Sequence, residues 1–123
     1  MANKTILIVE DEADLAMMLK MRLEANNYRA IIAVDGQQGL EMARKDKPDL
    51  IILDIMLPKL DGFKVCRILK FDQKYKNIPV VILTARTQEA DKKMGKEVMA
   101  DAYLGKPFEP EVLLSKIKEL IKK

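Results

Sequence analysis

The chain has 123 residues, enough for one domain that buries about two-thirds of the surface exposed by its unfolded form. Its 22 Lys and Arg against 19 Asp and Glu leave a net charge of +3 without a dense basic stripe, and Trp is absent, so we expect no direct nucleic-acid binding. No run of about 18 apolar residues suits a membrane span, and the first residues lack a secretory pattern. With Cys66 as the only cysteine, an internal disulfide is excluded, and we expect a cytoplasmic protein.

Short apolar runs rich in β-branched residues alternate with longer stretches of helical periodicity. The expected strands are Thr5–Val9, Arg29–Ala33, Leu50–Leu53, Val80–Leu83 and Ala102–Leu104. The first expected helix spans about Ala13–Asn26, and one side of it carries Leu15, Met18, Leu19 and Leu23. The last spans about Pro110–Lys122, with Leu113, Leu114, Ile117, Leu120 and Ile121 on one side.

Two central runs, Leu50–Leu53 and Val80–Leu83, are apolar without alternation. Strands buried on both faces have this pattern, which is typical of a parallel sheet between two helical layers. Five strands alternating with five helices predict an α/β fold with a doubly wound sheet, covering residues 1–123 as one domain. Periodicity alone leaves two common strand orders open. In either order, a functional site is expected beyond the C-terminal ends of the strands.

Residues whose side chains can react or bind a ligand follow four of the five strands. Glu10 and Asp11 follow the first, Asp54 the third, Thr84 the fourth and Lys106 the fifth. Carboxylates that share one site repel each other unless a cation neutralises them. Oxygen ligands without nearby His or Cys suit a hard cation such as Mg²⁺.

Each of these residues also has an ordinary structural explanation. Asp11 could be a helix N-terminal acid, Asp54 a turn former and Thr84 a helix cap. Lys106 could be a surface charge. Those explanations do not account for all four occurring together at strand ends, and the combination is more specific than any member.

Four ordered motifs resemble the receiver domain of two-component response regulators over essentially the whole chain. They are Ile6–Glu12 (ILIVEDE), Asp54–Gly62 (DIMLPKLDG), Leu83–Ala85 (LTA) and Tyr103–Phe108 (YLGKPF). The resemblance implies a flavodoxin-like sheet of order 2-1-3-4-5. It also implies a phosphoryl group received from a sensor histidine kinase or a histidine phosphotransfer protein.

The resemblance implies a role for each acidic residue. Asp54 is expected to be the phosphoacceptor and a Mg²⁺ ligand, with Asp11 as a direct ligand and Glu10 acting through water. The backbone carbonyl of Met56 is expected to be a further ligand. Met56 and Arg86 flank the expected attack path and are expected to influence the lifetime of the phosphoryl group.

The resemblance also implies a switch. Thr84 is expected to bind a phosphoryl oxygen, and Lys106 to pair with Asp54 and then with the phosphoryl group. Tyr103 is expected to turn inward as Thr84 moves, altering a face made by the fourth helix, fifth strand and fifth helix that a downstream protein reads. The Lys106–Pro107 bond is expected to be cis, the form that is accessible before proline.

The chain departs from the family pattern near the fifth strand. Met99 stands where a Gly is common, so the fourth helix is expected to close differently, with slack at Gly95. Ala102 and Gly105 also replace common polar residues. These positions lie on or near the expected partner face. Cys66 is expected to be buried, and the eight Met residues are expected to fill the core.

Other functional classes would need different residues at the strand ends, or would not use these residues for phosphoryl transfer. An aspartyl phosphatase would need an acid at the position of Met56, so a metabolic enzyme is not expected. A flavin-binding protein would need a Ser-, Thr- or Gly-rich loop where Glu10 and Asp11 stand. A phosphorylation-independent interaction module and the receiver part of a larger DNA-binding regulator remain alternatives. We expect a stand-alone receiver, because no linker follows the last helix.

Overall fold

Five parallel strands form one sheet in the order β2-β1-β3-β4-β5, as the family resemblance implies. The computed structural model describes residues 3–85, 93–94 and 96–121. The strands are β1 (Thr5–Val9), β2 (Arg29–Ala33), β3 (Leu50–Leu53), β4 (Val80–Thr84) and β5 (Ala102–Gly105). Thr84, expected just after the fourth strand, is therefore its last residue.

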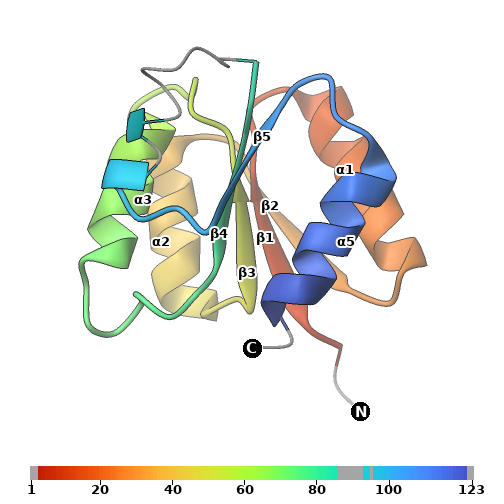
Figure 1. Cartoon of the computed structure of the whole chain (residues 1–123), viewed down its shortest axis with the longest axis horizontal. Coiled ribbons are helices and arrows are strands. Elements are labelled where there is room, and N and C mark those ends of the chain that lie inside the picture. The colour runs from red at the N-terminus through yellow and green to blue at the C-terminus, as the bar shows by residue number, and fades with distance from the viewer. Residues whose placement is uncertain (1–2, 86–92, 95, 122–123) are drawn as a thin grey trace.

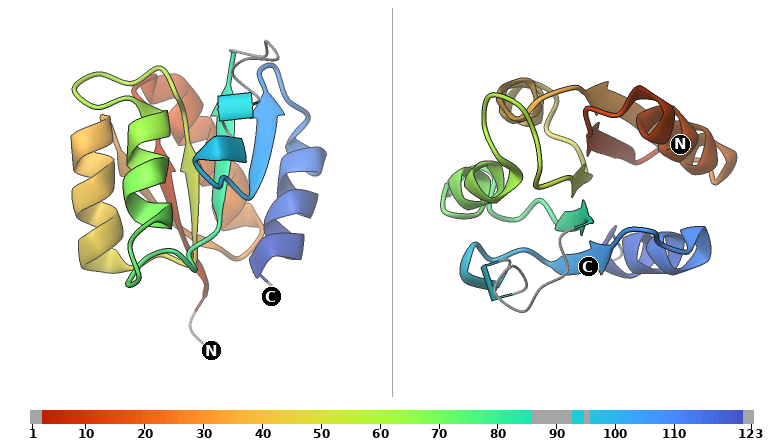
Figure 2. Two further views of the ribbon diagram at one scale, coloured as in Figure 1. Left: turned by 60° about the vertical axis from the view of Figure 1, so that its left-hand side comes forward. Right: turned by 90° about the horizontal axis from the view of Figure 1, so that it is seen from above.

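Helices cover both faces of the sheet (Figures 1 and 2). They are α1 (Ala13–Ala25), α2 (Gly36–Asp46), α3 (Gly62–Lys70) and α5 (Pro110–Ile121). α1 and α5 lie on one side, and α2 and α3 on the other. The fifth expected helix falls partly outside the described residues, although the described residues 93–94 and 96–97 are helical. Among the described helices, none combines the length and hydropathy needed to cross a membrane.

Each central strand contributes alternate side chains to two separate cores. In β1, Ile6 and Ile8 pack with α1 and α5, whereas Leu7 and Val9 belong to the core under α2 and α3. Every residue of β3 and β4 is buried. Burial on both faces explains why the sequence shows continuous apolar runs in place of alternation.

Two aspartates fix where α2 and α3 begin. The Asp35 carboxylate accepts a hydrogen bond from the Gln38 backbone N–H at 2.7 Å, and Asp61 accepts one from the Lys64 N–H at 3.1 Å. Such caps satisfy N–H groups that have no partner within the helix. In both cases a glycine follows the capping aspartate, at Gly36 and Gly62.

Several packing expectations were wrong. Met18 was expected in the core, but it is 42% exposed at the edge of α1, and Met17, Met21, Met56, Met94 and Met99 are also exposed. The helical period predicts which side of a helix is apolar, but it does not predict how much of that side a neighbouring helix covers. Met99 adopts φ 68, the left-handed conformation usually taken by glycine, although Met was expected to close the helix differently. Gly95 lies outside the described residues.

Cys66 is fully buried, as expected, and its thiol lies 3.5 Å from the Val98 carbonyl oxygen. Burial raises the pKa of this thiol to about 12. The unfolded chain loses this proton near pH 8.5. Protonated Cys66 therefore contributes stability that is complete below about pH 8.5 and is lost as the pH rises toward 12.

At about pH 8 we expect a thiol reagent to modify Cys66 in the native protein at least about 100-fold more slowly than in the urea-unfolded protein, as measured by intact mass. Equal rates would contradict this burial.

Candidate functional site

The register of the sheet places Glu10 and Asp54 side by side. Val9 pairs with Leu53 at the ends of β1 and β3, so the next residues of both strands leave the sheet at the same level. The Asp54 N–H donates to the Val9 carbonyl at 3.1 Å, and the Glu10 N–H donates to the Ala33 carbonyl at 3.0 Å. Only 3% of Glu10 and 7% of Asp54 is exposed. Backbone pairing therefore forces two carboxylates into a small, poorly solvated space.

The Lys106 ammonium lies between these two carboxylates. Its Nζ is 2.9 Å from Glu10 Oε1 and 3.0 Å from Asp54 Oδ2. Burial alone would lower the pKa of Lys106, but the hydrogen bonds to Glu10 and Asp54 together with the negative charges of these two residues outweigh burial and raise this pKa. Lys106 therefore stays charged over the physiological pH range. Its position is fixed by the bond from its backbone N–H to the Thr84 carbonyl at 2.8 Å.

Burial has the largest effect on the pKa of Glu10. Loss of hydration raises its pKa, and the charge of Asp54 raises it further, against the opposing effects of Lys106 and of the Glu12 N–H. The Glu12 N–H donates to Glu10 Oε2 at 3.1 Å, so both oxygens of the Glu10 carboxylate are engaged. Sequence reasoning paired Lys106 with Asp54 and did not foresee that Glu10 shares the same ammonium.

Asp11 adds an exposed carboxylate to this cluster. One carboxylate oxygen from each of Glu10, Asp11 and Asp54 lies within 4.8 Å of the others. Three oxygen donors at this spacing fit a hard divalent cation that retains several waters. Three carboxylates against one ammonium leave a formal excess of two negative charges, which one divalent ion would balance.

The loop between β3 and α3 contacts the acidic cluster at Asp54. The Met56 N–H donates to Asp54 Oδ1 at 3.2 Å, which orients the carboxylate that also meets Lys106. The Ile55 carbonyl accepts from Leu57 N–H at 3.0 Å and from Gly62 N–H at 2.9 Å, drawing the two ends of the loop together. Met56 itself is 61% exposed, although its backbone N–H contacts the buried Asp54.

The structure describes Thr84, Tyr103 and Pro107 among the remaining predicted site residues. Thr84 is fully buried at the end of β4 and pairs with Gly105. Tyr103 is half-buried and packs against the core under α2 and α3. The Lys106–Pro107 peptide bond is cis. Arg86 lies outside the described residues.

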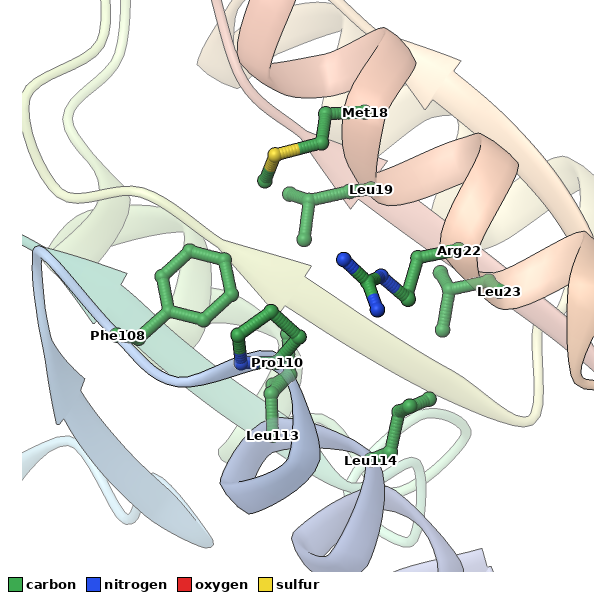
Figure 3. A pocket seen from close by; sticks show the side chains of 8 residues that line it. All are labelled: Met18, Leu19, Arg22, Leu23, Phe108, Pro110, Leu113 and Leu114. Carbon is green, nitrogen blue, oxygen red and sulfur yellow. The ribbon is translucent and has the colours of Figure 1, made fainter.

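A separate cavity lies between α1 and α5 (Figure 3). It measures about 10 Å³ and is lined mainly by apolar side chains. From α1 come Met18, Leu19, Arg22 and Leu23, and from the other side come Phe108, Pro110, Leu113 and Leu114. A space of this size holds at most about one water molecule. It offers no reactive group, so the acidic cluster remains the candidate site.

Comparisons with known proteins agree with this geometry. The family defined by the response regulator receiver domain matches residues 6–118, and the chain belongs to this family. It is 43% identical over 121 residues to the alkaline phosphatase synthesis transcriptional regulatory protein PhoP of Bacillus subtilis, covering 98% of this chain and 50% of that protein. It is 42% identical over 118 residues to the DNA-binding dual master transcriptional regulator RpaA of Synechocystis, covering 96% of this chain and 49% of that protein.

A solved structure extends the comparison to three dimensions. The receiver domain of the Francisella response regulator 1452 matches with a TM-score of 0.90 and 32% identity, over 98% of each chain. In contrast to this full match with a receiver domain, the chain spans about half the length of the two curated relatives described above. The expectation of a stand-alone receiver stays a prediction.

Two glycines border the site; sequence reasoning missed Gly36 and gave Gly62 only as a turn signal and the end of a motif. A Cβ at Gly36 would overlap the Leu60 carbonyl oxygen, and a Cβ at Gly62 would overlap the Asp54 carbonyl oxygen. Both glycines follow an aspartate in the sequence, and this repeated Asp-Gly pair is the signal that could have identified them. Asp35 also contributes, since its carboxylate lies 3.7 Å from the Lys59 ammonium.

Replacing Lys106 by Met should leave Glu10 and Asp54 buried without their cation. We expect Lys106→Met to lower the free energy of unfolding by about 2–4 kcal/mol near pH 7, as measured by urea denaturation without divalent ions. Because the pKa of Glu10 is already raised, the loss should shrink as the pH falls and carboxylates take up protons.

Lys116→Met provides the matched control, because the ion pair of Lys116, with Glu119 at 3.6 Å, lies on the exposed surface. It should change the free energy of unfolding by less than about 0.5 kcal/mol. An equal loss of unfolding free energy in the two variants, near pH 7 and at lower pH alike, would contradict the electrostatic role of Lys106.

Proposed function

We propose that this chain receives a phosphoryl group on Asp54 in a Mg²⁺-dependent reaction and thereby switches a protein-interaction surface. The observation that carries the proposal is the contact of one buried ammonium, Lys106, with both Glu10 and Asp54 beside the exposed carboxylate of Asp11. This arrangement balances part of the negative charge and leaves room for a divalent cation. Membership of the receiver family supports the same reading.

The chemistry assigned to Asp54 is nucleophilic attack by a carboxylate oxygen on phosphorus. A new O–P bond forms while the bond from phosphorus to the donor breaks, and the electron pair of that bond leaves with the donor. With phosphohistidine as the donor, the imidazole nitrogen takes up this pair. The product is a mixed anhydride on Asp54, which water later cleaves to the free carboxylate and inorganic phosphate.

The surroundings of Asp54 suit this reaction. The Met56 N–H and the Lys106 ammonium hold its two oxygens at 3.2 and 3.0 Å, so the side chain is oriented before a donor arrives. Lys106 can also follow the negative charge onto the transferred group, because phosphoryl transfer depends mainly on positioning and neutralisation. Burial of Asp54 strengthens these interactions by excluding water.

The residues proposed to hold Mg²⁺ are Asp11, Asp54 and the Met56 carbonyl, with Glu10 acting through water. The ion would neutralise phosphoryl oxygens and help to align the reacting atoms. Glu10 suits an indirect role, since both of its oxygens already accept hydrogen bonds from Lys106 and Glu12. Asp11 is exposed and free of such demands among the hydrogen bonds described for residues 3–85, 93–94 and 96–121.

The donor is proposed to be a sensor histidine kinase or a histidine phosphotransfer protein. The phosphoryl group would draw Thr84 toward it and Tyr103 inward, biasing the face formed by the fourth helix, β5 and α5. A phosphorylation-independent interaction module is the alternative, and the labelling experiment below distinguishes the two. Direct nucleic-acid binding, metabolic catalysis and membrane association are not part of the proposal.

Asp54→Asn should abolish labelling by a small acyl phosphate. We expect the wild-type protein with Mg²⁺ to gain the mass of one phosphoryl group, and the variant or a chelator-treated sample to gain none, as measured by intact mass spectrometry. Asp61→Asn is the matched control in the same loop, because asparagine also caps helices and should preserve α3 and the labelling. Labelling that persists in Asp54→Asn would overturn the assignment, and an unlabelled wild type would favour the passive module.

Asp11→Asn should weaken Mg²⁺ binding with little effect on folding. Since disturbing the surroundings of a metal ligand already costs about 10–100-fold in affinity, removing the charge of a direct ligand should raise the Kd at least about tenfold. Calorimetric titration with Mg²⁺ alone measures this change. Asp14→Asn, in the first turn of α1, controls for the loss of an exposed acid and should bind like the wild type. Equal affinities of the two variants would remove Asp11 from the site.

A further inference from the structure

We propose that Gly36, at the first turn of α2, is a positioning residue that sets the height of the β3–α3 loop over the acidic cluster. The inference rests on the proposed Mg²⁺ site and extends it to a residue outside that site. Two facts carry it: the Gly36 N–H donates to the Pro58 carbonyl at 3.3 Å, and the Gly36 Cα faces the Leu60 backbone with no room for a Cβ.

The contact at Gly36 is steric and not conformational. Its φ lies outside the left-handed region, since every positive φ in the described residues belongs to a non-glycine residue. Alanine could therefore adopt the backbone conformation of Gly36, and its helix propensity is higher. Its Cβ, however, would overlap the Leu60 carbonyl oxygen and lie 2.7 Å from the Leu60 carbonyl carbon. Both atoms belong to the backbone, so a side-chain rotation cannot relieve the overlap and the loop or the helix must move.

The loop is held at its other end as well. A Cβ at Gly62 would overlap the Asp54 carbonyl oxygen, and the Gly62 N–H donates to the Ile55 carbonyl at 2.9 Å. The segment from Met56 to Leu60 is therefore held by a close backbone contact at each end, at Gly62 and at Gly36. A displacement at Leu60 has to be absorbed within this short segment, which carries the proposed carbonyl ligand of Met56.

The segment has little slack to absorb such a displacement. Lys59 adopts φ 68, and the Leu60 N–H donates to the Pro58 carbonyl at 2.8 Å across it, which makes a tight three-residue turn. The Pro58 carbonyl is the same group that accepts from Gly36. The Asp35–Lys59 ion pair at 3.7 Å adds a weaker link, because 67% of the Lys59 side chain is exposed.

The test compares Gly36→Ala with Gly39→Ala. Gly39 lies one turn further along α2, and the three atoms nearest to its added Cβ belong to the Val9 side chain, at 2.8–3.4 Å, so the crowding falls on a side chain and not on the backbone of the loop. We expect Gly36→Ala to raise the Kd for Mg²⁺ alone at least tenfold by calorimetry, and Gly39→Ala to change it less than twofold. In metal-free protein, the amide NMR resonances of residues 56–57 and 59–61 should shift in Gly36→Ala and stay in place in Gly39→Ala.

A second pair of variants keeps the test decisive if Gly36→Ala does not fold. Lys59→Pro cannot adopt a positive φ and breaks the turn, whereas Lys59→Ala removes only the ion pair. Lys59→Pro should weaken Mg²⁺ binding at least fivefold relative to Lys59→Ala, and raising the Mg²⁺ concentration should restore acyl-phosphate labelling.

Equal Mg²⁺ affinity within either folded pair, or unshifted loop amides in Gly36→Ala, would overturn the inference. A wild type that binds no Mg²⁺ would instead refute the proposed function. In that case the amide shifts still report whether Gly36 controls the loop.

Discussion

The site depends on one electrostatic arrangement, the Lys106 ammonium held between Glu10 and Asp54. Parallel pairing of β1 with β3 brings the two carboxylates together whether or not their charges favour it. Two buried acids at this spacing would otherwise lose hydration and repel each other. Lys106, the residue that follows β5, supplies the compensating charge from the far side of β4, which makes the order of the strands a condition for the stability of the site.

Much of this arrangement could be predicted from the sequence because it follows from strand ends. All five strands were located from apolar runs, and parallel pairing places every C-terminal end at one edge. The strand order needed the family resemblance, since apolar periodicity does not distinguish neighbours. The sharing of Lys106 by Glu10 could not be predicted, because it depends on how deeply the Glu10 side chain is buried.

Other features escaped prediction because they arise from close approach between distant segments. Gly36 and Leu60 are far apart in sequence, and only the folded chain shows that their backbones touch. The exposure of Met18 also depends on tertiary packing, since Met18 lines the cavity between α1 and α5 and stays 42% exposed while Leu19 and Leu23 on the same helix are buried (Figure 3). Met99 shows the opposite case, in which a locally unfavourable residue adopts a left-handed conformation. A left-handed Met costs about 1–2 kcal/mol, which the packing of a whole domain can offset.

The charge balance also explains how phosphorylation could act as a switch in this fold. Three carboxylates and one ammonium would be neutralised by one divalent cation, so the unmodified site needs no further donor. A phosphoryl group adds about one to two negative charges along with new acceptor oxygens. The added charge has to be met by groups within reach, and Lys106 already serves two partners. Thr84 carries a hydroxyl at the end of β4 and pairs across the sheet with Gly105, the residue before Lys106, which is why it is the residue proposed to respond to the added charge.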